Sequence, residues 1–279
     1  MHELWGIGMR VDNEQTYLDL LADVMANGEK RGDRTGVGTL SVFGRQARYS
    51  IQPFPAVTTK RLFFRGVKEE LLWMLAGGTN VRPLQERGVH IWDHWADEDG
   101  ELGPVYGAQW RKWPGPVPEE GFYDQVSDLV RSIQESPESR RHMLSAWNVS
   151  DLWLMRLAPC HVLAQFHVRQ GRFLDCQMYQ RSADLFLGVP FNIAQYALLT
   201  SMLAQVTGYE PGDLIHTMGD AHIYLNHLTQ VDEQLSRTPC TPPELWLAPE
   251  VTRIDDYTVN DIWLQDYECW PKIEAPVAV

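Results

Sequence analysis

One stretch in the middle of the chain, Leu157 to Asn192, constrains the fold more than any other. It contains two strand-like runs, His161 to Val168 and Arg172 to Tyr179, and the residues Gln170-Gly171 between them are typical of a hairpin turn. A mostly apolar run from Asn192 to Val206 follows and predicts a helix that begins at an asparagine. The chain is therefore expected to combine a β-sheet with helices.

Further elements are predicted from apolar periodicity and capping residues along the rest of the chain. Helices are expected at Asp12 to Gly28, Arg65 to Ala76, Phe122 to Gln134 and Tyr224 to Gln234, and strands at Thr39 to Tyr49, His142 to Val149 and Asp213 to Thr217. The proline-rich segments Trp113 to Gly121 and Thr238 to Pro249 are expected to be loops. With 279 residues and no internal repeat, a single domain is the expectation.

The charge of the chain limits what it binds. A formal net charge of −13 argues against a general nucleic-acid or anionic-membrane surface, because a phosphate polymer would be repelled, so any phosphate must be held by local arginines. The 4 cysteines show neither C-x-x-C spacing nor the density of a disulfide scaffold, which favours a reducing, cytoplasmic setting. No apolar run reaches signal-peptide length at the N-terminus or about 18 residues elsewhere, so no membrane association is expected.

The same central stretch carries residues with complementary chemistry. Cys160 is a possible thiol nucleophile, and Asn192 offers a planar amide. In the cluster of Arg181, Ser182 and Asp184, the arginine can bind an anion. Such a set is suited to attack, hold and read an electron-poor heterocycle.

Several other residues allow two interpretations. The loop Gly32 to Thr39 is either a turn or a phosphate-binding loop with Arg34 at its centre, and it lacks the ending of a Walker A loop. Glu70 is either on the solvated side of its helix or a buried acid with a raised pKa. Arg140 and Arg141 form either an exposed charged patch or an anion clamp.

A segment rich in tryptophan and histidine follows Glu70. His90 and His94 have the spacing of helical metal ligands, but there is no H-E-x-x-H motif and no third clustered histidine, so a zinc site is the weaker interpretation. Trp92 and Trp95 are more typical of a stacking wall.

Taken together, these residues resemble the thymidylate synthase family, whose members methylate deoxyuridylate with a folate. The similarity runs from about Tyr17 to Val279 and rests on motifs that follow the order of the family. The motifs are Asp33-Arg34-Thr35-Gly36, Phe54-Pro55, Thr58-Thr59-Lys60-Arg61, Glu70-Leu71-Leu72-Trp73, Ile91-Trp92-Asp93, Trp95-Ala96-Asp97, Gly103-Pro104-Val105-Tyr106-Gly107, Ser139-Arg140-Arg141, Ala158-Pro159-Cys160-His161, Tyr179-Gln180-Arg181-Ser182, Pro190-Phe191-Asn192-Ile193-Ala194 and Ala275-Pro276-Val277.

The resemblance implies an α/β fold in which one domain spans residues 1–279. A large mixed β-sheet would be flanked by helices, and two copies would pair sheet to sheet as a homodimer. Residues 1–12 would be an N-terminal extension that matches none of the motifs, and residues 273–279 a C-terminal tail that closes over the folate.

The implied reaction is the reductive methylation of dUMP to dTMP. Cys160 would add to C6 of uracil, Arg181 would favour its thiolate, and the resulting enolate would attack the methylene group of 5,10-methylenetetrahydrofolate. The folate would also supply the hydride, so neither a metal nor a nicotinamide is needed. The catalytic residues implied by the resemblance are Cys160, Glu70, Tyr106, His161, Asn192 and Arg181.

The resemblance also implies two sets of binding residues. For dUMP these are Arg34, Gln180, Arg181, Ser182, Asn192, His222 and Tyr224, with Arg140 and Arg141 reaching across from the partner subunit. For the folate they are Lys60, Ile91, Trp92, Trp95, Asp184, Leu187, Gly188, Phe191 and Val279. Asn192 would read N3–H and O4 of uracil, whereas an aspartate there would suit cytosine.

Two alternatives stay open at this point. A dUMP hydroxymethylase would use the same cysteine and folate with water in place of hydride in the last step, and Trp92 and the tail favour methylation because they exclude water. A non-catalytic RNA-binding or regulatory role fits the negative charge and the complete site less well. Phe63 stands where a histidine near the folate tail is expected, which leaves the preference for folate polyglutamates open.

Overall fold

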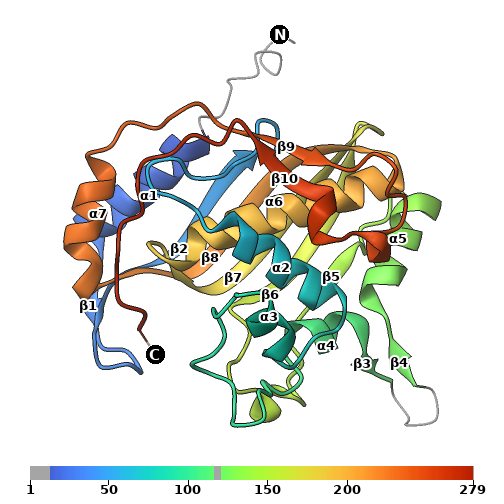
Figure 1. Cartoon of the computed structure of the whole chain (residues 1–279), viewed down its shortest axis with the longest axis horizontal. Helices are drawn as coiled ribbons and strands as arrows, with labels where there is room; N and C mark the ends of the chain where they lie inside the picture. Colours follow the sequence, from blue (N-terminus) through green and yellow to red (C-terminus); the bar gives the residue numbers. More distant parts are fainter. Residues whose placement is uncertain (1–12, 116–120, 279) are drawn as a thin grey trace.

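A computed structural model describes residues 13–115 and 121–278. The predicted N-terminal extension 1–12 and the predicted folate-binding Val279 lie outside the described residues. In the described part, helices and loops pack against one large β-sheet (Figure 1). This confirms the predicted α/β fold class.

The main sheet contains six strands among the described residues, in the spatial order β1-β2-β8-β7-β6-β5. The strands are β1 (Glu29–Arg31), β2 (Thr39–Ser50), β5 (Met143–Ser145), β6 (His161–Arg169), β7 (Phe173–Asp184) and β8 (Glu210–Tyr224). Neighbouring strands are antiparallel except β7 and β8, which are parallel, so the predicted mixed sheet is confirmed. The predicted hairpin joins β6 to β7, and Gln170 and Gly171 both have the positive φ that a tight hairpin turn needs.

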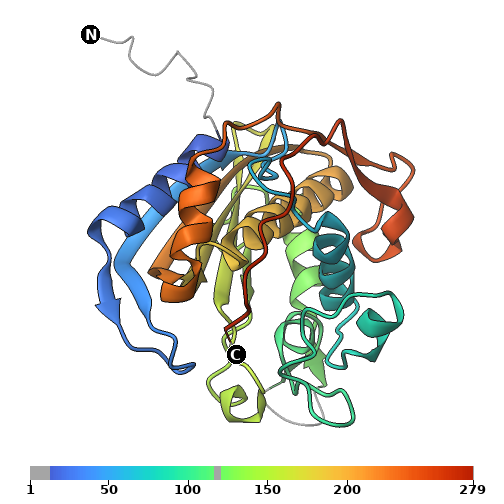
Figure 2. The same ribbon diagram turned by 60° about the vertical axis from the view of Figure 1, so that its left-hand side comes forward.

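The helices gather on one face of this sheet (Figures 1 and 2). The α-helices are α1 (Asn13–Asn27), α2 (Phe64–Leu75), α3 (Arg82–Glu86), α4 (Tyr106–Arg111), α5 (Gln125–Glu135), α6 (Gly188–Thr207) and α7 (Leu228–Leu235). α6 packs on β7 and β8 and is covered in turn by α2 and α5, which explains why it is apolar on nearly every side. None of the helices in the described ranges is both long and apolar enough to span a bilayer.

Shorter elements complete the fold. The strand pair β3 (Trp113–Pro114) and β4 (Phe122–Tyr123) flanks residues 116–120, and the pair β9 (Glu244–Leu247) and β10 (Ile262–Gln265) lies near the C-terminus. Turns of 3-10 helix occur at Leu152–Leu154, Leu225–His227, Ile254–Asp256 and Val259–Asp261.

Several predicted boundaries were wrong because of contacts distant in sequence. The segment Thr238 to Pro249, predicted to be a loop, contains β9, which pairs with β10. β5 is shorter than predicted because only Met143–Ser145 pairs with β6. β8 is three times the predicted length because it pairs with β2 along one edge and β7 along the other. The helix predicted from Phe122 begins at Gln125, since Phe122–Tyr123 pairs with β3 and Asp124 caps the helix.

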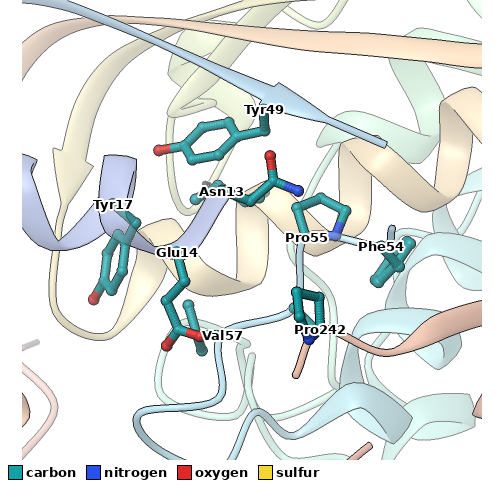
Figure 3. Close-up of a pocket in the computed structure, with 10 residues that line it drawn as sticks. Asn13, Glu14, Tyr17, Tyr49, Phe54, Pro55, Val57 and Pro242 are labelled. Carbon is teal, nitrogen blue, oxygen red and sulfur yellow. The ribbon is translucent and has the colours of Figure 1, made fainter. Parts of the chain in front are cut away.

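The first turn of α1 fixes the loop that leads to α2. The buried Glu14 carboxylate accepts hydrogen bonds from the backbone N–H groups of Thr58 and Thr59 at 2.8 and 2.7 Å and from the Thr58 hydroxyl at 2.6 Å. Beside it lies a small, partly open pocket of about 10 Å³, lined in part by Asn13 and Tyr49 (Figure 3). A cavity of this size holds at most one water, and none of the predicted site residues lines it.

Candidate active site

Cys160 lies in the turn directly before β6, beside the end of β7. Its Sγ is 3.9 Å from Nη2 of Arg181 on β7. The guanidinium is held in place because it donates to the carbonyls of Ala158 and Pro159, at 2.8 Å each. Strand pairing therefore brings the predicted nucleophile next to a fixed cation.

The pKa of the Cys160 thiol is set by burial and by two nearby charges. Burial raises the pKa of the thiol above its ordinary value of 9.0, the charge of Arg181 lowers it, and Asp184 raises it further. Arg181 thus acts in the direction that favours the thiolate, but burial is the stronger influence. The thiol is protonated at neutral pH.

Tyr106, at the start of α4, orders the backbone at Cys160. Its hydroxyl accepts a hydrogen bond from the Cys160 N–H at 2.7 Å, and its ring stacks on His161 with ring centres 4.3 Å apart. Nδ1 of His161 is 3.1 Å from the hydroxyl of Tyr196 on α6. Burial lowers the pKa of His161 to about 3, so this imidazole is neutral at physiological pH.

Glu70 points into the protein from α2. One carboxylate oxygen accepts from the indole N–H of Trp92 and the other from the amide of Gln195 on α6, both at 2.6 Å. Burial raises the pKa of Glu70 to about 7, while these two hydrogen bonds act to lower it. A carboxyl group that titrates near neutral pH is suited to acid–base catalysis.

Gln195 was not predicted from the sequence. It lies within an apolar helix, three residues after Asn192, and is almost completely buried. Polar residues are rarely buried in such a helix without a partner, and that mismatch is the signal that points to Gln195.

Trp92 and Trp95 pack edge to face with ring centres 5.9 Å apart, and the ring of Trp92 also contacts Tyr106. The adjacent Ile91 is partly buried against the same core. His90 instead bonds the carboxylate of Asp93 at 2.8 Å, on the exposed side. Across residues 13–115 and 121–278, no group of histidine, cysteine and carboxylate side chains is arranged to hold a metal ion.

Asn192 lies one turn inside α6, not at its start as predicted. Its Oδ1 is 3.0 Å from Nε2 of Gln180 on β7, and the same Nε2 donates to the Ser182 carbonyl at 2.9 Å. Gln180 is buried, whereas Asn192 and Ser182 are partly exposed. The structure thus brings these three predicted dUMP-binding residues together.

Asp184 closes the turn between β7 and α6. Its Oδ1 accepts from the backbone N–H groups of Phe186 at 3.0 Å and Leu187 at 3.2 Å. Gly188 and Phe191 follow in the first turn of α6 and are partly exposed. The predicted folate-binding residues Asp184, Leu187, Gly188 and Phe191 are therefore close together at the start of α6, and each is partly exposed.

Lys60 reaches the same turn from the loop before α2. Its Nζ donates to the Phe186 carbonyl and lies 3.4 Å from the centre of the Phe186 ring. Burial lowers the pKa of Lys60 to about 7, and the Asp184 carboxylate works against that shift. Lys60 is thus anchored to the turn that carries Asp184.

His222 and Tyr224 lie at the end of β8, where His222 is the register partner of Asp184 on β7. Nδ1 of His222 is 3.0 Å from Oδ1 of Asp220. Burial acts to lower the pKa of His222, but the hydrogen bond to Asp220 and the charge of Asp184 outweigh it and the pKa is raised. The rings of His222 and Tyr224 meet edge to face at 5.3 Å.

The geometry now includes a cysteine, a buried carboxyl group and an oriented amide in one site. A family model described as thymidylate synthase matches residues 15–279. The chain belongs to the thymidylate synthase family. At the level of the family, this means folate-dependent one-carbon transfer to dUMP, with methylenetetrahydrofolate as the co-substrate.

The charge of Arg34, a predicted phosphate-binding residue of this thymidylate synthase family member, acts on Tyr224 at the end of β8, as does that of Cys160. Arg34 is exposed in a loop whose shape is set by Asp33, which accepts from the backbone N–H groups of Thr35 and Gly38 at 2.8 and 2.6 Å. The hydrogen bond from the Thr35 hydroxyl is the main cause that lowers the pKa of Asp33. Burial acts to raise this pKa but is outweighed. The loop is therefore held by an ionised carboxylate.

Arg140 and Arg141 lie beside the middle of β6, away from Cys160. The Arg140 carbonyl accepts from the side chain of Gln165, which is five residues beyond Cys160 and thus about 16 Å away along the strand. Both arginines are exposed. The structure does not bring them together with Cys160 of the same chain.

The C-terminal tail runs past α7 toward the site (Figure 2). Ile273 is buried, and the Pro276 carbonyl is 2.7 Å from Nε2 of the buried His227. The ring of His227 packs against Phe186 and Tyr224. The C-terminal segment is thereby tied to the turn beside the predicted ribose and folate residues.

Proposed function

We propose that the protein reductively methylates dUMP to dTMP, with 5,10-methylenetetrahydrofolate as donor of both carbon and hydride. The observation that carries the proposal is a chain of contacts from the predicted nucleophile to the buried carboxyl group, with the Asn192 amide close by on α6. Cys160 bonds Tyr106, whose ring meets Trp92, and Trp92 bonds Glu70. Asn192 lies on α6 one turn before the other partner of Glu70, Gln195.

The proposed reaction begins when the Cys160 thiol releases its proton to solvent and the thiolate adds to C6 of uracil, which moves an electron pair through C5 to O4. The C5 carbanion equivalent attacks the folate methylene, and loss of the C5 proton with release of the folate amine leaves an exocyclic methylene group. Hydride from tetrahydrofolate then reduces that group to methyl, oxidising the folate to dihydrofolate, and the C6–S bond breaks to free Cys160. Glu70, with its pKa near neutrality, serves the proton transfers at O4 and C5.

The preference for hydride over water in the last step is supported by the surroundings of Glu70. Trp92 is nearly buried against Trp73, Trp95 and Tyr106, and the tail is tied down by the bond from His227 to Pro276. Excluding water from this region protects the exocyclic methylene until hydride arrives.

The reaction products test the proposal directly. We expect incubation with dUMP and methylenetetrahydrofolate to yield dTMP and dihydrofolate in equal amounts. Mass spectrometry of the nucleotide and the absorbance of the folate measure the two products. A hydroxymethyl product with tetrahydrofolate released would instead identify a hydroxymethylase. Absence of any turnover by the folded protein would favour a non-catalytic role.

We further propose that the active unit is a homodimer in which Arg140 and Arg141 bind the phosphate in the partner's site. Their separation from Cys160 within one chain supports this. The sheet face opposite α6 also carries exposed polar groups, where Gln46 and Gln177 both donate to the hydroxyl of Thr217. This uncovered face is suited to pairing sheet to sheet.

Mixing two inactive variants tests this arrangement. A double variant with Arg140→Ala and Arg141→Ala and a second variant with Cys160→Ala are each expected to be inactive. After unfolding and refolding together, about a quarter of wild-type activity is expected, because half of the dimers are mixed and each has one complete site. The control is a mixture of the two variants that were refolded separately and do not exchange subunits. If co-refolding restores no activity, both arginines act in their own chain's site or outside any site.

A further inference from the structure

The middle of β8 contains a buried histidine with no role in the chemistry described so far. His216 is completely buried, and its Nε2 is 2.9 Å from Oε1 of Gln180 on the neighbouring strand. Its Nδ1 is buried and has no hydrogen-bond partner within the described ranges. Burial lowers the pKa of His216 to about 3, so the imidazole is neutral.

The amide of Gln180 has one chemically allowed orientation. A backbone carbonyl only accepts hydrogen bonds, so the group that lies 2.9 Å from the Ser182 carbonyl must be the amide nitrogen. The other end of the amide, its oxygen, therefore faces His216 and needs a donor. This requires a neutral His216 to carry its hydrogen on Nε2, which agrees with a bare, unpartnered Nδ1.

The orientation of Gln180 in turn determines that of Asn192. Because Nε2 of Gln180 donates, the atom of Asn192 that lies 3.0 Å from it must be the oxygen Oδ1, and the Asn192 amide nitrogen is on the other branch. Uracil offers a donor at N3 and an acceptor at O4, whereas cytosine offers an acceptor at N3 and a donor at N4. An asparagine amide suits one base in one orientation and the other base when it is rotated by half a turn.

We propose that His216 is a specificity-determining positioning residue: by donating from Nε2 to Gln180 Oε1, it holds the Gln180–Asn192 pair in the order that selects a uracil nucleotide over a cytosine nucleotide. The inference rests on the proposed function, since it concerns the base that Asn192 reads. Without the donor, the buried Gln180 oxygen has no partner and the amide is no longer held from both ends. Asn192 then samples both orientations.

The test compares kcat/KM for dUMP and for dCMP, each with methylenetetrahydrofolate, in three variants. His216→Phe keeps the ring and removes the donor, and we expect the preference for dUMP over dCMP to fall about tenfold. His216→Gln places an amide nitrogen near the position of Nε2 and is expected to keep the preference within about threefold of wild type. His142→Phe is the matched control, because His142 is also completely buried but bonds Ser132 and Pro137 and not Gln180 or Asn192, so the preference for dUMP over dCMP is expected to stay unchanged.

A measurement on the wild-type protein does not depend on any variant folding. Nitrogen NMR of labelled histidine is expected to show His216 neutral, with its hydrogen on Nε2. A hydrogen on Nδ1, or an unchanged dUMP preference in a folded His216→Phe variant, would overturn the inference. Wild-type protein that converts no dUMP would contradict the proposed function instead, while the NMR result would still decide whether His216 donates to Gln180.

Discussion

Replacing Cys160 with alanine is expected to lower turnover of dUMP by at least about 10³-fold, because no other group in the site can form the bond to C6. Binding of dUMP is expected to change little, since the groups that read the base and hold the phosphate lie on other residues. Steady-state kcat and a calorimetric dissociation constant, measured on the same preparation, separate these two effects. Turnover within about tenfold of wild type would show that Cys160 is not the nucleophile.

Cys240→Ala provides the matched control for this substitution. Cys240 is also partly exposed, and it is the backbone N–H of this residue, not its thiol, that donates to the Thr58 hydroxyl at 2.8 Å. Its loss is expected to leave turnover unchanged. A similar loss in both variants would indicate a general effect of removing thiols, not a catalytic one.

The fold was predictable where the local pattern of the sequence matched the burial of the strand. β6 and the start of β7 were predicted to within one residue because a two-residue turn joins them and buried and exposed side chains alternate in the middle of β6, whereas β7 extends five residues beyond its predicted end. β8 was predicted as five residues because it is a central strand with neighbours on both edges and is buried along most of its length. Such a strand does not alternate, so periodicity detects only part of it.

The start of α6 was wrongly predicted from a local sequence signal. An asparagine before an apolar run is the usual sign of a helix N-cap, yet α6 begins four residues earlier. The cause is Asp184, which accepts from the N–H groups of Phe186 and Leu187 and so turns the chain into the helix sooner. Asn192 is thereby available to bond Gln180 in place of capping the helix.

The resemblance to a family predicted most of the residues that gather in the site, but not the residues that support them. Gln195 contacts Glu70 across 125 positions of sequence, and His216 contacts Gln180 across 36. Neither pairing is encoded in a local pattern. The pKa shift of Cys160 could not be predicted either. The sequence indicates that Arg181 is near the thiol, but not that burial raises the pKa more than Arg181 lowers it.

Replacing Glu70 with glutamine is expected to lower kcat by about 10²-fold to 10⁴-fold while the protein stays folded. The amide has the shape of the carboxyl group, but it cannot exchange protons. Its new N–H would face Gln195, whose Oε1 is buried without a hydrogen-bond partner in the described ranges, so a rotated Gln195 amide can accept it. Wild-type kcat/KM is expected to show an inflection near pH 7 that the variant lacks.

The neighbouring carboxylate supplies the control for Glu70→Gln. Glu69 is buried on the same helix, but it bonds Arg87 at 3.0 Å and contacts none of the site residues described above. Glu69→Gln is therefore expected to reduce stability without changing kcat. Equal losses of kcat in the two variants would show that α2 responds to any change of charge and that Glu70 has no special function.

The raised pKa of Glu70 also predicts how stability depends on pH. Between the ordinary value of 4.5 and the folded value of about 7, the folded protein holds a proton that the unfolded chain has lost. The free energy of unfolding contributed by this group is therefore full below pH 4.5 and falls as the pH rises through 7, by about 3 kcal/mol in total. The glutamine of Glu70→Gln cannot ionise, so the free energy of unfolding of this variant lacks that pH dependence. Urea unfolding is therefore expected to show that, relative to wild type, the variant is about 3 kcal/mol more stable at about pH 8 than at about pH 5. An identical pH dependence in both proteins would mean that Glu70 ionises as easily in the fold as in water, and its burial would then have no part in proton transfer.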